Sequence, residues 1–233
     1  MANSEIIGAG QDTARRAPKK YQIIYADPPW NYTTFSSGHG GRQTNQHYKT
    51  MRMVDIYDMP VKKISEDNAF LFLWAVPSLL PEALHTMSCW GFDYKTIAFT
   101  WVKLNTKSGT PFFGMGQWTR TNSEICLIGL RGKPERKSAA VSQVIMSAIE
   151  EHSKKPDEAR KRIVELCGDI PRIELFARQR VEGWDAWGNE IEESPVLGEE
   201  SPAQNTAEIC HTAPNSAMLR GLKPHAGNTG TSA

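Results

Sequence analysis

The sequence has no run of about 18 consecutive apolar residues, so it predicts no membrane-spanning helix and no membrane partner. Its first residues, MANSEIIGAGQDTARR, lack the apolar centre of a secretory signal. That leaves the cytosol or the nucleus, and we expect a cytoplasmic protein. The four cysteines form no CxxC pair and have no histidine at metal-ligand spacing, so no metal site is expected.

Neither sign of charge dominates: 27 Lys and Arg residues stand against 26 Asp and Glu residues, and the formal net charge is +1. A protein that binds nucleic acid through bulk positive charge, such as a histone, carries a large excess of cations. The near-zero net charge therefore argues against a protein that binds nucleic acid through bulk positive charge. It does not exclude an enzyme that holds nucleic acid through a local patch.

The composition predicts one folded domain between two solvated ends. We expect a flexible arm at residues 1–20, a domain at 21–193 and a disordered tail at 194–233. The tail is rich in Ser, Pro, Ala, Gly, Asn and Thr and has no apolar period. Such a segment cannot bury enough surface to offset the entropy of its chain. The remaining domain, about 170 residues long, has the usual size.

Within the domain, short apolar runs alternate with helical patterns. Buried strands are predicted at Tyr21–Ala26, Ala69–Ala75, Thr96–Val102, Ile125–Leu130 and Arg172–Phe176. Helices are predicted at Ser78–Trp90 and at Pro156–Cys167, where Pro156 suits the first turn and Gly168 ends the helix. The alternation predicts an α/β sheet with helices on both faces, in which ligands lie beyond the carboxyl ends of the strands.

The sharpest motif comes directly after the first strand and consists of Asp27, Pro28, Pro29 and Trp30. The two prolines fix the turn and remove two backbone donors, which leaves carbonyls and a carboxylate as acceptors beside an aromatic ring. Acceptors of this kind suit a conjugated amine, whose two N–H groups they can bind while the ring stacks on it. The alternative is an ordinary Asp-Pro turn with a surface tryptophan.

This motif resembles the catalytic tetrapeptide of the MT-A70-like methyltransferases. The resemblance extends over roughly residues 21–192, because three further motifs follow in the same order: Lys155-Pro156-Asp157-Glu158, Glu174-Leu175-Phe176 and Trp187-Gly188-Asn189. It implies a Rossmann-like class I methyltransferase sheet with permuted order, in which the catalytic motif precedes the cofactor motif. It also implies transfer of a methyl group from S-adenosylmethionine to the exocyclic N6 amine of adenine.

The resemblance further assigns roles to single residues. Asp27 accepts one proton of the adenine amine, the Pro28 carbonyl accepts the other, and Trp30 forms part of the adenine pocket. Cofactor contacts fall on Lys155, Arg178, Arg180, Asn189 and Glu190. Arg180 and Glu190 depart from the eukaryotic pattern, in which histidine and glutamine are common. Taken alone, the motif at Lys155 is also simply a good helix start.

Two loops are predicted to shape the substrate pocket, residues 31–50 and 103–122. Both mix glycines, aromatics and cations, which can stack on an extruded base and hold phosphates. The alternative is a mobile surface loop. The candidate substrate-binding residues are Tyr32, Arg42, Lys103, Asn105, Trp118 and Arg120, together with Glu124, which matches an acidic residue near the adenine pocket in relatives.

The favoured function is therefore an N6-adenine methyltransferase that acts on DNA, with S-adenosylmethionine as cofactor. DNA is preferred because the chain has neither zinc-finger spacing nor an RNP-type motif. Two alternatives stay open: the same chemistry on RNA adenosine, and a non-catalytic subunit that binds nucleic acid for an active partner.

Overall fold

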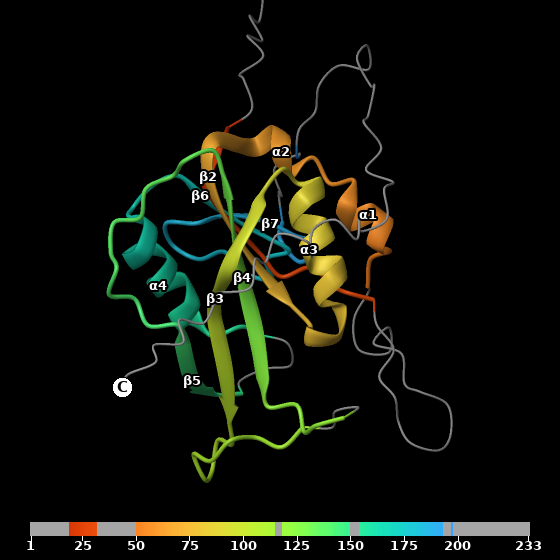
Figure 1. Cartoon of the computed structure of the whole chain (residues 1–233), viewed down its shortest axis with the longest axis vertical. Helices are drawn as coiled ribbons and strands as arrows, with labels where there is room; N and C mark the ends of the chain where they lie inside the picture. The colour runs from red at the N-terminus through yellow and green to blue at the C-terminus, as the bar shows by residue number, and fades with distance from the viewer. Residues whose placement is uncertain (1–18, 32–49, 115–117, 150–153, 193–196, 198–233) are drawn as a thin grey trace, which may run out of the picture.

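In the computed structural model, the described residues are 19–31, 50–114, 118–149, 154–192 and 197, and they form one seven-stranded sheet (Figure 1). The strand order is β5-β3-β4-β2-β1-β6-β7. The strands are β1 (Tyr21–Ala26), β2 (Ser65–Ala75), β3 (Asp93–Leu104), β4 (Ser123–Arg131), β5 (Val144–Ala148), β6 (Arg172–Leu175) and β7 (Asp185–Trp187).

Strand direction fixes where a site can form. Only β4 runs antiparallel to its neighbours, so the other strands all end at the same edge of the sheet. At that edge Ala26 of β1 pairs with Leu73 of β2 on one side and with Leu175 of β6 on the other. After β1 the chain continues to β2, toward one edge strand of the sheet. After β6 it continues to β7, toward the opposite edge strand. The boundary between β1 and β6 is therefore a topological switch point, where open α/β sheets bind ligands.

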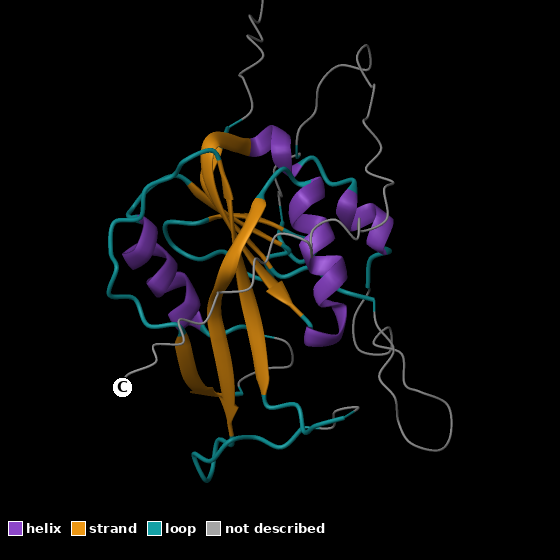
Figure 2. Ribbon diagram, in the orientation of Figure 1, coloured by secondary structure: helices purple, strands orange, loops and turns teal. Residues whose placement is uncertain are grey.

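Helices cover both faces of this sheet, as expected (Figure 2). On one face lie α1 (Met53–Tyr57), α2 (Val61–Ile64), the 3-10 turn η2 (Pro77–Leu79) and α3 (Leu80–Cys89); α4 (Asp157–Cys167) covers the other. The strands supply both cores by alternation: Ile24 and Ala26 of β1 face α1 and α3, whereas Ile23 and Tyr25 face α4. The central strands are thus buried on both sides.

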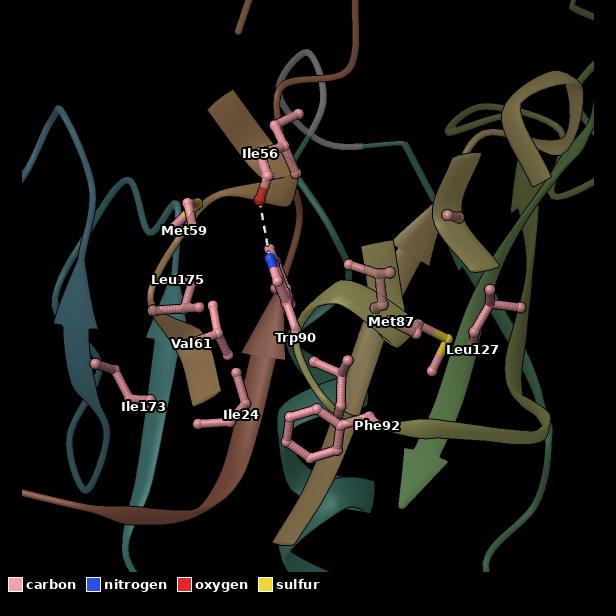
Figure 3. Packing of buried hydrophobic residues seen from close by; sticks show 14 of the residues in the cluster. Ile24, Ile56, Met59, Val61, Met87, Trp90, Phe92, Leu127, Ile173 and Leu175 are labelled. Atoms are coloured by element: carbon pink, nitrogen blue, oxygen red, sulfur yellow. Dashed lines mark hydrogen bonds between the residues drawn. The ribbon is translucent and has the colours of Figure 1, made fainter. Parts of the chain in front are cut away.

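The core under α3 is closely packed around Trp90, which follows the helix and is fully buried (Figure 3). Its indole N–H donates to the carbonyl of Ile56 in α1 at 2.8 Å, which ties the two helices together. Gly129 of β4 passes directly beneath: a Cβ added there would lie 2.5 Å from the terminal carbon of Met87. A larger residue at position 129 would therefore require the Met87 side chain to move.

The prediction for α4 is confirmed almost to the residue. Pro156 precedes its first turn, Asp157 and Glu158 lie in that turn, and Gly168 ends it with φ +95°. Acidic side chains in the first turn are stabilised by the helix dipole. β1 also has the predicted bounds, and β6 differs from its prediction only at its end.

Other elements differ from the predictions. β2 begins at Ser65 and β3 at Asp93, each before the apolar run that predicted it. The short elements α1, α2, β5 and β7 were missed. β5 is an edge strand with alternating exposure, and β7 has three residues, so neither shows a continuous apolar run. Helices as short as α1 and α2 have too few turns for a period to be visible.

Within the described part of the chain, no helix is long and apolar enough to cross a membrane. The predicted arm and tail lie outside the described residues except for Lys19, Lys20 and Leu197. Lys19 contacts the domain, because its ammonium lies 2.6 Å from the carboxylate of Asp185 in β7.

Candidate active site

Asp27 occupies the first position after β1, at the switch point between β1 and β6. The turn that follows is held by backbone bonds: the Trp30 N–H donates to the Pro28 carbonyl at 2.8 Å, and the Met51 N–H donates to the Pro29 carbonyl at 3.1 Å. The turn is thus anchored to the chain that leads into α1, and the direction of the Asp27 side chain is set by rigid neighbours.

The Asp27 carboxylate belongs to a network of four charges that alternate in sign. The ammonium of Lys155 lies 2.6 Å from Oδ2 of Asp27 and 3.3 Å from Oε2 of Glu124. Glu124 in turn accepts a hydrogen bond from Lys103 on its other oxygen. The order Lys103, Glu124, Lys155, Asp27 gives a net charge of zero at neutral pH.

Burial and the neighbouring charges shift the pKa values of these groups. Burial raises the pKa of the Asp27 carboxyl above its usual range, and the ammonium of Lys155 opposes that shift. Burial works against ionisation of Glu124 too, but Lys155 and Lys103 together bring the pKa of that carboxyl below its usual range. For Lys155, burial is outweighed by Asp27 and Glu124, so the pKa of the ammonium is raised and the group stays charged.

A layer of aromatic rings lies beneath the cations. The Lys155 ammonium is 5.5 Å from the ring centre of Trp74, and that of Lys103 is 5.1 Å from Trp101. The Trp74 indole is fixed in turn, because its N–H donates to the buried Tyr25 hydroxyl at 2.7 Å. Both ammonium groups thus rest on buried indoles, whose faces attract cations.

Trp30 does not lie where the resemblance predicted. Its side chain is only 3% exposed and belongs to the core beneath α1 and α3, and its indole N–H donates to the Trp74 carbonyl at 3.0 Å. A ring enclosed in this way has no free face for a base. The expectation that Trp30 stacks on adenine is wrong for this structure; instead the ring anchors the catalytic turn to the core.

The Pro28 carbonyl was expected to accept a proton from adenine, but it already accepts the N–H of Trp30 within the turn. A carbonyl oxygen has two lone pairs, so one remains. Pro28 itself is buried. Asp27 is thus the better placed acceptor of the two.

The segment after β6 lies next to Asp27 and contains the expected cofactor residues. Phe176 has φ +62°, a left-handed conformation that is strained for a bulky residue and is found mostly at functional sites. The Ala177 N–H donates to the Trp187 carbonyl at 2.9 Å, and a Cβ on Gly188 would lie 2.2 Å from the Ala177 carbonyl oxygen. The ends of β6 and β7 are therefore pressed together by a glycine that nothing larger can replace.

This segment presents polar side chains rather than a glycine-rich loop. Arg178, Asn189 and Glu190 are exposed at the ends of β6 and β7, and Arg178 is near enough to Asp27 to help lower the pKa of its carboxyl. A guanidinium, an amide and a carboxylate suit the carboxylate and hydroxyl groups of S-adenosylmethionine. Arg180 instead donates to the carbonyl of Glu192 at 2.8 Å, which ties it to the chain after β7.

The predicted substrate residues fall into three groups. Lys103 and Glu124 lie in the charge network. Trp118 and Arg120 lie in the loop between β3 and β4, and the Trp118 side chain is 96% exposed. Tyr32 and Arg42 lie outside the described residues.

For Asn105 the substrate role is not supported. Its side-chain amide lies 3.3 Å from the carbonyls of Thr110 and Pro111, so its donors hold its own loop together. The sequence could not distinguish this role from a substrate contact, because both place a polar amide in a loop.

One buried pair was missed. The guanidinium of Arg160 in α4 donates to both carboxylate oxygens of Glu174 in β6, at 2.8 and 2.7 Å, above the ring of Tyr25. An acidic residue within the buried strand RIEL signals such a pair, because a buried charge needs a partner. The pair fixes the start of α4, and with it Lys155, against β6.

No cluster of His, Cys, Asp or Glu that could hold a metal ion occurs among the described residues. What the site offers instead is a partly buried acceptor, Asp27, beside a polar segment that can hold an adenosine-containing cofactor.

Comparison with known proteins agrees with this arrangement. The MT-A70 family model matches residues 21–190. The type II methyltransferase M.MunI of a Mycoplasma species is 31% identical over 195 residues, which cover 76% of this chain and 81% of that protein. The N(6)-adenosine-methyltransferase subunit METTL3 of Danio rerio is 28% identical over 189 residues, which cover 79% of this chain. The chain spans only 30% of that protein's length. With its motifs in the expected order and the family model matching most of its length, this chain belongs to the MT-A70 family.

Proposed function

We propose that this protein transfers a methyl group from S-adenosylmethionine to the N6 amine of adenine in DNA. The observation that carries the proposal is the position of Asp27, a partly buried acceptor at the carboxyl end of β1, directly beside the polar segment that follows β6. Substrate amine and methyl donor then meet at one edge of one sheet.

Asp27 acts on the amine through one oxygen. Lys155 holds Oδ2, and within the described part of the chain Oδ1 makes no hydrogen bond, so Oδ1 is available to an N–H of adenine. The amine is a poor nucleophile because its lone pair is delocalised into the ring. An acceptor held in a fixed position draws the N–H toward itself and favours the tetrahedral nitrogen, and such preorganised acceptors are a large source of acceleration.

For the cofactor, Arg178, Asn189 and Glu190 would hold the ribose and neighbouring groups. S-adenosylmethionine supplies a methyl group that is already activated by a positively charged sulfur. The chain's own contribution is then to bring the amine into line with the donor and to exclude water. Fixing the ends of β6 and β7 through Ala177 and Gly188 serves this positioning.

DNA is the preferred substrate because the relative matched over most of both chains is a type II methyltransferase, a DNA-modifying class. The METTL3 relatives, which are named for N(6)-adenosine, make RNA the second candidate. In either case the base must leave its stack, which costs a few kcal/mol and favours unpaired or weakened sites. We also propose that the protein acts in the cytoplasm.

A substrate panel tests the proposal. The full chain is incubated with methyl-labelled S-adenosylmethionine and DNA and RNA oligonucleotides of one sequence set, each single- and double-stranded. The nucleic acid is then digested and its nucleosides are identified by mass. Labelled N6-methyldeoxyadenosine is expected. Labelled N6-methyladenosine from RNA alone would favour the second candidate, and cofactor binding without transfer to any oligonucleotide would favour a non-catalytic subunit.

A further inference from the structure

Lys103 was expected to bind substrate, but its surroundings leave it little freedom to do so. Its side chain is 20% exposed, its ammonium donates to Glu124, and the same ammonium rests over the buried ring of Trp101. A cation held from two sides is a poor ligand for a phosphate that arrives and leaves. Its partners connect it to Asp27 instead.

We propose that Lys103 is a positioning residue for Asp27 and acts on it through Glu124 and Lys155. The inference rests on the proposed function and deepens it, because it names a residue that sets the state of the acceptor. The four groups come from four separate segments: β3, β4, the chain that leads into α4 and the residue after β1.

The orientation of Asp27 depends on how the Lys155 ammonium is shared between its two carboxylate partners. Two carboxylates compete for this one ammonium, and it lies nearer to Asp27, at 2.6 Å, than to Glu124, at 3.3 Å. Lys103 makes that division possible, since it compensates the Glu124 charge from the other side. Without Lys103, three charges with a net value of −1 remain, and Glu124 draws Lys155 away from Asp27.

When Lys155 moves toward Glu124, the Asp27 carboxylate loses both its fixed orientation and part of its charge compensation. The groups that bear on its ionisation are Lys155, Glu124, Arg178 and the buried thiol of Cys126. Of these, Lys155 is the group whose position depends on Lys103. Neutralising Glu124 as well removes the competition, so Lys155 returns to Asp27.

A double-mutant cycle tests this inference with the full-length protein. Lys103→Met keeps most of the apolar stem, Glu124→Gln removes one charge, and the double variant restores a balanced pair of Lys155 and Asp27. We expect Lys103→Met to lower kcat roughly tenfold and the added Glu124→Gln to recover several-fold of that loss, a coupling typical of groups in one network. Lys103→Arg, which retains the charge, should stay within about threefold of wild type.

The pH profile gives a second readout. In Lys103→Met the acidic limb of kcat should move to higher pH, because Asp27 is less well compensated, and in the double variant it should move back. The matched control is Lys95→Met, which changes an exposed lysine near the start of the same strand. Thermal melting of each variant confirms that it is folded.

The outcomes separate this inference from the proposed function. If wild type methylates DNA but the double variant is no faster than Lys103→Met, the positioning role is wrong and the proposed function stands. If Lys103→Met raises the KM for DNA and leaves kcat and the pH profile unchanged, Lys103 contacts the substrate instead. If wild type modifies no adenine, the proposed function itself fails.

Discussion

At the scale of single residues, the site is defined by what each polar atom is already bonded to. Asp27 has one oxygen on Lys155, the Pro28 carbonyl accepts the Trp30 N–H, and the Trp30 indole donates to the Trp74 carbonyl. Each of these bonds occupies a donor or a lone pair that could otherwise contact substrate, although one lone pair of the Pro28 carbonyl remains. What remains at the rim is chiefly the second oxygen of Asp27.

The buried position of Trp30 gives a prediction that separates core from pocket. Trp30→Ala should reduce the free energy of unfolding by about 3–5 kcal/mol, because it leaves a large cavity under the catalytic turn. Urea denaturation of both proteins measures this. Trp30→Phe, which keeps most of the ring, should stay folded and methylate with nearly the wild-type KM for DNA. A stable Trp30→Ala protein with only a raised KM for DNA would show that the ring stacks on the base after all.

The shifted pKa of Asp27 predicts the pH dependence of the reaction. Burial raises the pKa, so the carboxyl takes up its proton at a higher pH than an ordinary aspartate, which titrates near about 3.9. Since only the ionised form is the strong acceptor, kcat/KM should begin to fall on acidification at a pH above that value. Initial rates across the acidic range, with folding checked by circular dichroism, measure the limb. A limb at or below the ordinary aspartate value would contradict the assignment.

At the scale of elements, the site depends on how α4, β1 and β6 are held together. The pair Arg160–Glu174 joins α4 to β6 under the ring of Tyr25, and both side chains are 11% exposed. Lys155 lies two residues before α4, so a shift of the helix would move the ammonium from Asp27. The pair therefore supports the site although neither residue reaches it.

Breaking this pair on one side should destabilise the protein. Glu174→Leu leaves the guanidinium of Arg160 with Asp157, at 2.6 Å, as its remaining carboxylate partner. The loss of unfolding free energy should therefore be smaller than the about 3–5 kcal/mol that a fully unpaired buried charge costs. Arg160→Met combined with Glu174→Leu replaces both charges by apolar groups and should recover most of that loss. Urea denaturation of wild type, of Arg160→Met and Glu174→Leu singly and of the double variant decides this, and additive losses would mean that the pair contributes no coupling.

The contact between the ends of β6 and β7 gives a prediction about the cofactor. Gly188→Ala places a methyl group against the Ala177 carbonyl, so the two strand ends must separate. Binding of S-adenosylmethionine, measured by calorimetry, should weaken at least tenfold, equivalent to about 1.4 kcal/mol. Glu182→Ala, an exposed change in the same connection, is the control. If Gly188→Ala binds S-adenosylmethionine with unchanged affinity, this segment is not part of the cofactor site.

At the scale of the whole molecule, topology explains the motif order. The turn with the proposed acceptor Asp27 follows β1 and the proposed cofactor segment follows β6, far apart in sequence, yet β1 and β6 are neighbours in the sheet. The sheet thereby brings the two halves of the reaction to one edge. The permutation concerns the order of the motifs along the chain. The strands that carry the motifs still lie side by side in the sheet.

The features of this structure that could be predicted from the sequence are those set by residues close together in the chain. The strand ending at Ala26, the helix after Pro156 and the acidic motif at Asp27 all follow from neighbouring residues. The positions of Trp30 and Asn105 could not be predicted in this way, because a tryptophan or an amide in a turn can face either solvent or its own chain. The linkage of Lys103 to Asp27 depends on four distant segments, so no local pattern contains it.

The most direct test of the central claim is methyl transfer by Asp27→Asn, with S-adenosylmethionine binding measured on the same preparation. Asparagine keeps the shape of the side chain but removes its charge. The account predicts a fall in labelled N6-methyldeoxyadenosine of at least about a hundredfold, or roughly 2.7 kcal/mol of transition-state stabilisation, with cofactor affinity nearly unchanged. Methylation by Asp27→Asn at close to the wild-type rate would contradict it.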